Sequence, residues 1–291
     1  PDRAFHSIVI AGTNGKGSVT AMLERALRAA GWRTGRYTSP HLVSINERFA
    51  IDGRPVGDDA MRAGLEAVRQ VSLRMDPLPT FFEATTALAC ELFRTAGVDV
   101  AVMEVGLGGR LDATNALEPV ATAITAIDLD HQVYLGDTLA LIAGEKAGII
   151  KPGIPVVLAP NVAEVDKVVA AAAFAKRAPL VRAGEGVEIA STFEDGRLIV
   201  DIRTPKARYG PLALGLRGRH QLDNALAMVR LAETIDASTA VAIPASAIES
   251  GLRDVEWPGR LQVESWRGAS VLIDAAHNPA GARALAAYVA E

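Results

Sequence analysis

The sequence predicts an α/β fold, in which a parallel β-sheet is flanked by helices and accompanied by a small antiparallel β subregion. Short apolar strand patterns alternate with helical patterns as far as residue 182, as is typical of parallel sheets covered by helices. From residue 187 to 216, short β segments follow one another without intervening helices. Apolar residues make up 49% of the 291 residues, which is enough for a substantial core.

Periodicity and turn residues give the expected elements of the first half. Strands are expected at 8–11, 33–37, 99–105, 121–127, 155–159 and 179–182. Helices are expected at 19–30, 58–74, 83–95, 137–147 and 162–176. Ser18 is a suitable N-cap for the first helix and Gly31 a suitable stop. The pair Asp52-Gly53 predicts a hairpin over 46–56.

The second half changes character and then begins a new α/β unit. Its β segments are expected at 187–190, 198–203 and 212–216, and its helices at 221–234 and 245–253. The sequence Trp-Pro-Gly-Arg at 257–260 interrupts the pattern and is the candidate linker. A strand at 271–274 and a helix at 279–289 predict the start of a Rossmann-like C-terminal domain. We therefore divide the chain at residue 257, into domain 1–257 and an incomplete unit 258–291.

Charge and composition exclude several classes of protein. The chain has 30 Lys and Arg against 34 Asp and Glu, a net charge of −4, so it lacks the basic face of a nonspecific nucleic-acid binder. Cys90 is the single cysteine, which rules out an intrachain disulfide. No apolar run approaches the roughly 20 residues of a membrane helix, and the N-terminus is no signal peptide. We expect a soluble, cytoplasmic protein with neither nucleic acid nor membrane as partner.

The strongest local motif is a glycine-rich loop between the first strand and the first helix. Glycines let backbone N–H groups turn toward phosphate oxygens, and the helix N-terminus adds partial positive charge. Lys16 is placed to reach the β- and γ-phosphates, although Gly17 separates it from Ser18, unlike in the strict G-x-x-x-x-G-K-[ST] motif. A structural βα turn is the alternative, but such a turn needs neither three glycines nor a lysine. The predicted nucleotide-binding residues of the loop are Gly12, Thr13, Asn14, Gly15, Lys16, Gly17 and Ser18.

This loop, Gly12-Thr-Asn-Gly-Lys-Gly-Ser18, resembles that of the Mur ligase superfamily. Further motifs resemble the folylpolyglutamate synthase and dihydrofolate synthase family, occur in its order and cover nearly the whole chain. They are YTSPHL at 37–42, NER at 46–48, TFFE at 80–83, EVGLGGRLDATN at 104–115, DLDH at 128–131, EKAGI at 145–149, PGR at 258–260 and DAAHNP at 274–279. The resemblance implies a central ATP-binding domain followed by part of a glutamate-ligase domain. Because residue 1 is Pro and the last helical pattern has no cap, we expect a fragment truncated at both ends.

The resemblance also implies a metal site for Mg²⁺, which binds oxygen ligands and neutralises nucleotide phosphates. It assigns ligation to Thr38, Glu104 and His131. Glu104 ends a buried strand, where ligands gather in open α/β sheets. Ser39 remains an alternative to Thr38. From chemistry alone a lone His in a loop is more often a hydrogen-bonded residue, and only the resemblance makes His131 a ligand.

Two interpretations of Lys146 are possible. A Lys beside a Glu on a helix is usually part of a solvated face. The motif Glu-Lys-Ala-Gly resembles the segment in which the family carries a carbamylated lysine. That modification requires an uncharged amine and hence a depressed pKa, and its product can hold a second Mg²⁺.

On the acceptor side, the resemblance assigns the pterin and benzoate parts of the substrate to two segments. Phe81 and Phe82 offer a flat apolar wall, for which core packing is the alternative, and Asp112 offers a hydrogen-bond acceptor. Nearby positive charge suits anionic glutamate tails and comes from Arg36, His41, Arg48 and Arg110. The predicted substrate-binding residues are Thr80, Phe81, Phe82, Glu83, Leu111, Asp112 and Ala113.

A second nucleotide-binding face is implied by three matched residues. Asn224 resembles the adenine-side asparagine of the family, with helix capping as the alternative role. Arg260, in the linker, matches a residue that reaches the phosphates when the domains close. Asp274, with His277 close behind, matches a nucleotide-binding aspartate. Closure over the cleft would exclude water from a reactive intermediate.

The resemblance implies an ATP-dependent ligase. A substrate carboxylate attacks the γ-phosphate of ATP, and the amine of L-glutamate then attacks the acyl phosphate. The acid is a folate, dihydropteroate or both, and the protein is expected to be a monomer. Lys16, Lys146 and His131 are the candidate catalytic residues, with ATP and Mg²⁺ as cofactors. The alternatives are another Mur-type amino-acid ligase and an inactive nucleotide-binding fragment.

Overall fold

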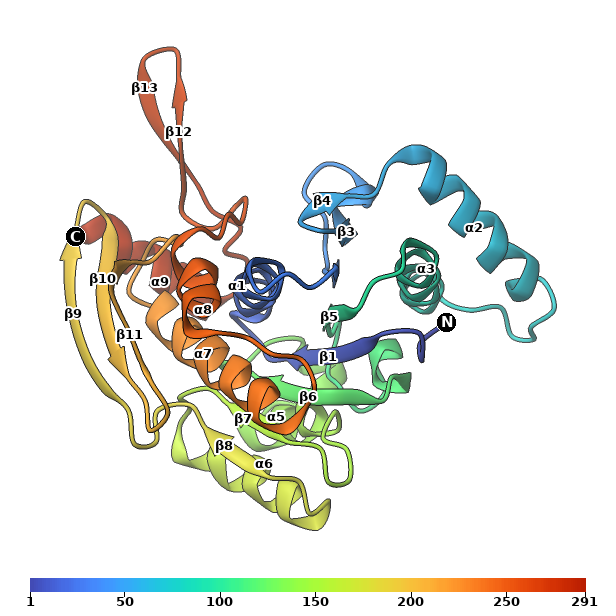
Figure 1. The fold of residues 1–291 in the computed structure, drawn as a ribbon, viewed down its shortest axis with the longest axis horizontal. Coiled ribbons are helices and arrows are strands. Elements are labelled where there is room, and N and C mark those ends of the chain that lie inside the picture. The colour runs from blue at the N-terminus through green and yellow to red at the C-terminus, as the bar shows by residue number, and fades with distance from the viewer.

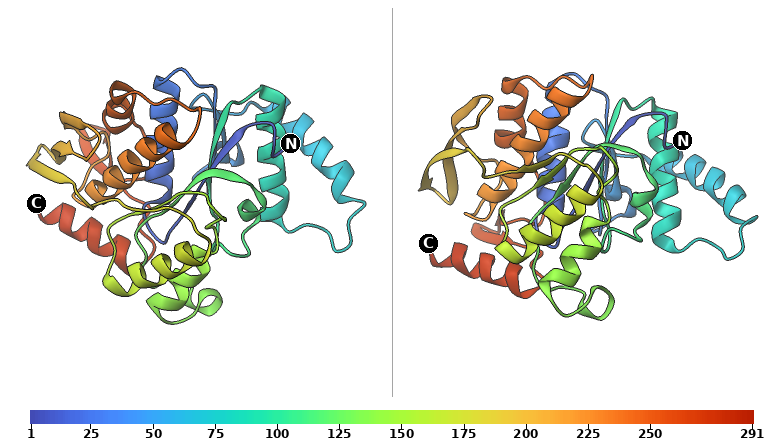
Figure 2. Two further views of the ribbon diagram at one scale, coloured as in Figure 1. Left: turned by 60° about the horizontal axis from the view of Figure 1, so that its bottom comes forward. Right: turned by 90° about the horizontal axis from the view of Figure 1, so that it is seen from below.

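A central sheet of eight strands organises the molecule, in a computed structural model that describes residues 1–291 (Figures 1 and 2). The strand order is β4-β3-β2-β5-β1-β6-β7-β8. Strands β2 and β5 to β8 run parallel with β1, and β3 and β4 form an antiparallel edge. The bounds are β1 (His6–Ala11), β2 (Thr34–Tyr37), β3 (Phe49–Ile51), β4 (Arg54–Pro55), β5 (Val100–Glu104), β6 (Pro119–Ile124), β7 (Val156–Leu158) and β8 (Leu180–Arg182).

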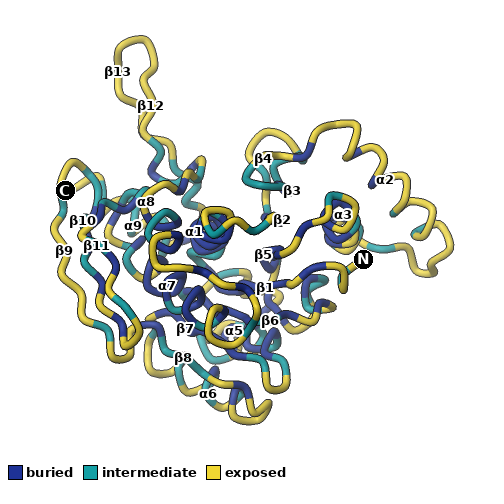
Figure 3. The backbone as a smooth tube through the Cα atoms, viewed as in Figure 1, coloured by how far each residue is buried: buried dark blue, intermediate teal, exposed yellow.

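Helices cover both faces of this sheet, which is why its central strands are apolar throughout. Ile8 and Ile10 of β1 pack with α1, α7 and α8, whereas Val9 and Ala11 pack with α3, α5 and α6 on the other face. Helix α2 extends away from the body, and its exposed surface is visible in Figure 3. The bounds are α1 (Lys16–Ala29), α2 (Asp58–Ser72), α3 (Phe81–Ala96), α4 (Gln132–Leu135), α5 (Leu139–Ala147), α6 (Ala163–Ala175), α7 (Gln221–Ser238) and α8 (Ala245–Arg253).

Parallel pairing brings the carboxyl ends of three strands to one edge of the sheet. Strand β1 lies between β5 and β6, with Ile10 opposite Glu104 and Ala11 opposite Ile124. The loops that follow these strands therefore meet at the same place. This edge is where ligands bind in open α/β sheets.

The expected antiparallel subregion is a separate three-stranded sheet of order β11-β10-β9. Its strands are β9 (Glu188–Glu194), β10 (Arg197–Arg203) and β11 (Arg208–Ala213). It packs on the α7 and α8 side through residues such as Leu198 and Val200. The predicted fold class is confirmed.

Two local expectations differ from the structure. Helix α1 begins at Lys16 with Gly15 as N-cap, so Ser18 is not the cap, whereas Gly31 does follow the helix end with a φ of 91°. The hairpin around Asp52 and Gly53 is shorter than expected because Ile45–Arg48 form the 3₁₀ helix η1. A second 3₁₀ helix, η2 (Ala113–Ala116), follows β5.

The C-terminal segment contains a projecting hairpin and a helix. The expected strand at 271–274 is β13 (Ala269–Ile273), and it pairs with β12 (Gln262–Trp266), which we did not predict (Figure 1). Strand β12 carries a Gln, a Glu and a Ser, so its apolar pattern is weak. Helix α9 (Pro279–Ala290) follows. The division at residue 257 stays a prediction. No helix combines the length and the apolar composition that crossing a membrane requires.

Candidate nucleotide site

Two glycines of the loop after β1 have conformations and neighbours that only glycine permits. Gly12 has a φ of 152° and Gly15 a φ of 88°. A Cβ on Gly12 would lie 1.8 Å from Oγ1 of Thr125, which follows β6. A Cβ on Gly15 would lie 2.1 Å from Oδ1 of Asn224 in α7. The loop thus curls tightly against the elements that flank it.

Two lysines converge on one carbonyl oxygen of this loop. Lys16 Nζ donates to Gly12 O at 3.1 Å and to Thr13 O at 3.2 Å, and Lys146 Nζ donates to Gly12 O at 2.8 Å. Lys146 is only 4% exposed, so the solvated-face reading is wrong. Burial, together with the positive charge of Lys16, lowers the pKa of Lys146 to about 7. A large fraction of this amine is therefore uncharged near neutral pH.

The depressed pKa of Lys146 predicts that the folded state gains stability as the pH rises. The unfolded amine keeps its ordinary pKa of 10.5, so between about 7 and 10.5 the unfolded chain binds more protons than the folded one. The free energy of unfolding should rise by up to about 1.4 kcal/mol per pH unit in this window. Chemical denaturation in CO₂-free buffer would measure this slope. Lys146→Met should remove this contribution and lower the slope, and exposed Lys167→Met should leave the slope unchanged; equal slopes in both variants would refute the assignment.

A cavity of about 340 Å³ gathers these groups at the sheet edge. All ten predicted nucleotide-binding residues line it, from the phosphate loop, α7, the linker and the segment after β13. The predicted metal ligands Glu104 and His131 and the predicted catalytic Lys146 line it too. Residues distant in the sequence thus surround one space. Their lining set is Gly12, Thr13, Asn14, Gly15, Lys16, Gly17, Ser18, Asn224, Arg260 and Asp274.

The buried carboxylate of Glu104 lies at the centre of the predicted metal site. Burial raises the pKa of Glu104, while the positive charge of Lys16 opposes this effect. Its Oε2 accepts from the backbone N of Ser39 at 3.2 Å. Ser39 lines the phosphate-loop cavity, whereas Thr38 is buried and lines a neighbouring cavity of about 740 Å³. A buried carboxylate among hydroxyl residues fits the oxygen chemistry of Mg²⁺. Ser39 and Glu104 line both cavities, whereas Thr38 lines only the second.

His131 begins helix α4 with a left-handed backbone, at a φ of 48°. Its Nε2 lies 3.9 Å from Oδ1 of Asp130, and its side chain is 51% exposed. No group of three or more His, Cys, Asp or Glu side chains is gathered as a metal centre. A metal held here would therefore need hydroxyl, water or phosphate oxygens besides Glu104 and His131.

The first acceptor segment caps a helix at the edge of the site. Thr80 and Glu83 form a capping box at the start of α3, with Glu83 Oε2 accepting from Thr80 N at 2.7 Å. Phe82 packs on Tyr37, with ring centroids 5.8 Å apart, and fills the space beside Gly106. Phe81 is 59% exposed and lies over the guanidinium of Arg48. Core packing thus applies to Phe82, and Phe81 remains free to contact a ligand.

The second acceptor segment is built around Asp112. Its Oδ2 accepts from Gly106 N at 3.0 Å and Leu107 N at 2.9 Å, and its Oδ1 accepts from Thr114. Asp112 therefore holds the loop after β5 in shape, and Leu111 beside it is 81% exposed. Leu111, Asp112 and Ala113 do not line the phosphate-loop cavity, although Gly106 and Leu107 do. Their substrate-binding role stays a prediction.

The basic residues predicted to attract anionic tails have partners within the protein. Arg48 Nε donates to His41 Nδ1 at 2.9 Å, and Arg110 pairs with Glu145 at 2.9 Å. Arg36 is 3.9 Å from Glu24, and its guanidinium lies 4.7 Å from the ring centroid of Trp257. These cations therefore already have partners within the protein, where they stabilise local structure.

Asn224 lies inside α7, one turn after the N-cap His220, so the capping alternative is wrong. It is buried and donates to Gln221 Oε1 at 2.8 Å. Across the cavity, Asp274 accepts from Leu261 N at 2.9 Å and from Ala276 N at 2.8 Å. Asp274 thereby fastens the linker on which Arg260 sits.

Trp257 joins the linker to α1. A Cβ on Gly17 would lie 3.0 Å from Trp257 Nε1, so the ring packs closely against the first turn of α1. Sequence reasoning gave Trp257 and Asn278 no role. The order Asn278-Pro279 does carry the pattern of an N-cap followed by a first-turn proline.

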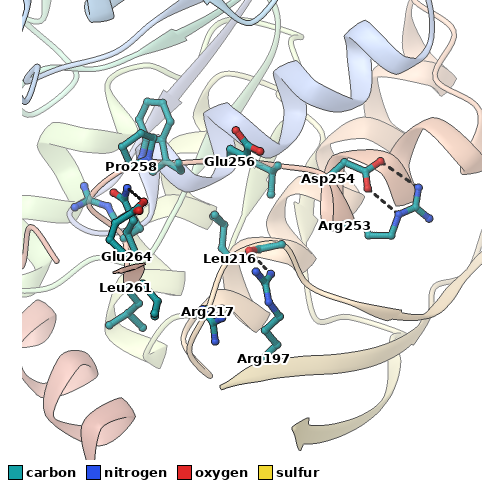
Figure 4. A pocket seen from close by; sticks show the side chains of 15 residues that line it. Arg197, Leu216, Arg217, Arg253, Asp254, Glu256, Pro258, Leu261 and Glu264 are labelled. Atoms are coloured by element: carbon teal, nitrogen blue, oxygen red, sulfur yellow. Dashed lines mark hydrogen bonds and ion pairs between the residues drawn. The ribbon is translucent and has the colours of Figure 1, made fainter. Parts of the chain in front are cut away.

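A separate cavity of about 470 Å³ lies between the linker and the small sheet (Figure 4). It shares only Arg260 and Leu261 with the phosphate-loop cavity. Its Arg197 donates to Leu214 O and Gly215 O, and Arg253 pairs with Asp254. It contains none of the lysines or carboxylates gathered at the phosphate loop.

Comparison with known proteins identifies the family to which this chain is similar. The Mur ligase middle domain matches residues 10–232. A dihydrofolate synthase/folylpolyglutamate synthase from Mycobacterium tuberculosis is 39% identical over all of this chain and 63% of its own length. A folylpolyglutamate synthase from Lacticaseibacillus casei is 36% identical over 98% of this chain and 68% of its own. The structure of an FPGS–AMPPCP–folate complex matches with a TM-score of 0.92 at 34% identity, over 98% of this chain and 71% of its own.

The chain spans about two thirds of the length of these curated relatives. The matches extend over 98–100% of this chain. The chain belongs to the folylpolyglutamate synthase and dihydrofolate synthase family of the Mur ligase superfamily.

Proposed function

We propose that this protein is an ATP-dependent ligase that adds L-glutamate to a folate, to dihydropteroate or to both. The observation that carries the proposal is the convergence of Lys16, Lys146 and buried Glu104 on one cavity behind a glycine-rich loop. The relatives' names support the substrates, since they include both synthase activities and a complex with AMPPCP and folate.

In the proposed reaction an oxygen of the substrate carboxylate attacks the γ-phosphorus of ATP, and ADP leaves. Lys16 and the loop N–H groups stabilise the negative charge on the transferring phosphoryl group. The amine of glutamate then attacks the acyl carbon, phosphate leaves, and the amine proton passes to solvent or phosphate. Asn224 is proposed to contact the adenine, and Arg260 and Asp274 to approach the nucleotide from the linker side.

We also propose that Mg²⁺ is held by Glu104, His131 and a hydroxyl, with Ser39 favoured over Thr38 by its place in the cavity. When bound, Mg²⁺ would neutralise phosphate charge. The uncharged amine of Lys146 can add to CO₂, losing a proton and becoming a carbamate that could hold a second ion. A carbonyl signal from ¹³C-bicarbonate that Lys146→Met lacks would test this step.

The test of the function is ADP release with ATP and Mg²⁺, measured with and without glutamate. Tetrahydrofolate and dihydropteroate are offered separately as acceptor, on this chain and on a longer chain matching its relatives. Release that needs both glutamate and one of these acids is the expected result. Release with other acids only would indicate another Mur-type ligase. Binding of a nonhydrolysable ATP analogue without release would indicate a nucleotide-binding fragment.

A further inference from the structure

One asparagine side chain connects three distant parts of the chain. Asn278 precedes α9 and is only 9% exposed. Its Oδ1 accepts from Gly281 N at 2.9 Å, which caps α9. Its Nδ2 donates to Asn14 Oδ1 and to Asp130 Oδ2, both at 3.0 Å. The acceptor and donor atoms of this amide therefore have different tasks.

The two acceptors of Nδ2 belong to the nucleotide cavity. Asn14 is part of the phosphate loop, and Asp130 precedes His131 in the loop after β6. Both are far from Asn278 in sequence, by 264 and 148 residues. The amide thus bridges the C-terminal segment to two loops that line the site.

The segment before Asn278 is in turn bonded to the linker. Ala275 N donates to Gly259 O at 2.9 Å, and Leu261 N donates to Asp274 at 2.9 Å. These bonds flank Arg260 on both sides. A side chain that anchors residue 278 to the phosphate loop therefore also fixes where Arg260 and Asp274 lie.

We propose that Asn278 is a positioning residue, whose Nδ2 group fastens the segment 274–290 to the phosphate loop and holds Arg260 and Asp274 at the nucleotide cavity. Its effect on nucleotide affinity depends on the proposed function; its effect on the docking of α9 does not. The competing explanation is that Asn278 only caps α9.

Asn278→Asp separates the two roles. Aspartate caps a helix as well as asparagine does, so α9 keeps its cap. The variant lacks both N–H donors and places a carboxylate against Asp130. Adding Asp130→Asn restores a donor–acceptor pair with the roles exchanged, and the Asn14 amide can turn over to donate to the new carboxylate.

Amide hydrogen exchange of the full chain without nucleotide is the primary measurement. We expect exchange across α9 and residues 12–18 to become about tenfold faster in Asn278→Asp, because the hydrogen bond to Asp130 is lost and the new carboxylate faces that of Asp130. The double variant should return to within about twofold of the parent. Arg283→Gln removes an exposed ion pair between α9 and Asp128, of 2.8 Å, and should change exchange by less than about twofold.

Unchanged exchange in Asn278→Asp would overturn the proposal, as would a double variant that exchanges as fast as the single one. Binding of AMPPCP supplies the second readout, with a dissociation constant raised about fivefold or more in Asn278→Asp and restored in the double variant. If the parent chain binds no nucleotide, the proposed function fails, while the exchange data still decide whether Asn278 docks the segment.

Discussion

Lys16→Met is expected to slow glutamate-dependent ADP release by about 10²–10³-fold, the cost of removing one preorganised electrostatic group from a reacting oxyanion. Lys16 Nζ lies over the carbonyls of Gly12 and Thr13, within the cavity that contains Glu104. It is the loop's only lysine, and Lys146 is itself half neutral near pH 7, so no other side chain of the loop replaces its charge. Steady-state kinetics would measure the loss.

The matched control for this substitution is Lys167→Met. Lys167 is exposed on α6 and does not line the cavity. The rate of ADP release by Lys167→Met should therefore stay within about twofold of that of the parent. The two variants carry the same change in net charge and differ only in position. A Lys16→Met enzyme slowed less than tenfold would contradict the role given to this lysine.

Gly12→Ala is expected to lower the free energy of unfolding by about 3–5 kcal/mol, from left-handed backbone strain and overpacking together. The new Cβ would lie 1.8 Å from Thr125 Oγ1. This hydroxyl cannot simply move away, because it donates to Asn14 O at 2.7 Å within the same loop. Urea denaturation would measure the change.

Gly153→Ala is the control for backbone strain alone. Gly153 also has positive φ, at 72°, but a Cβ there meets nothing within 4 Å. It should cost about 1–2 kcal/mol. Thr125→Ala, combined with Gly12→Ala, should recover part of the loss by removing the clashing oxygen. Equal costs at Gly12 and Gly153 would show that the close approach to Thr125 is unimportant.

The central strands and the place of the site could be predicted from the sequence where strands are buried on both faces. Strands β1 and β5 are continuous apolar runs, which only a sheet covered on both faces explains, and the loop after β1 carries its own motif. Strand β12 is mostly exposed, so burial imposed no pattern from which to predict it.

The sequence did not predict which side chains face the nucleotide cavity. Thr38 and Ser39 are adjacent hydroxyl residues that both line the neighbouring cavity, and only the fold shows that Ser39 also lines the nucleotide cavity. Asn224 is a residue type that often caps helices, but α7 begins at Gln221 as expected, so Asn224 lies within its first turn. Asp112 has a local structural task that no motif encodes, since its partners lie in a loop that folds back on it.

Trp257 is one of three tryptophans in the chain, and the one whose ring lies between the linker, the guanidinium of Arg36 and the first turn of α1. Trp32 donates to Ala242 O, and Trp266 lies in the projecting hairpin. Indole emission depends on nearby charge and on exposure to water. A movement of the linker away from α1 should therefore change the fluorescence of Trp257. The protein thus carries its own optical reporter at the joint between its linker and its phosphate-binding helix.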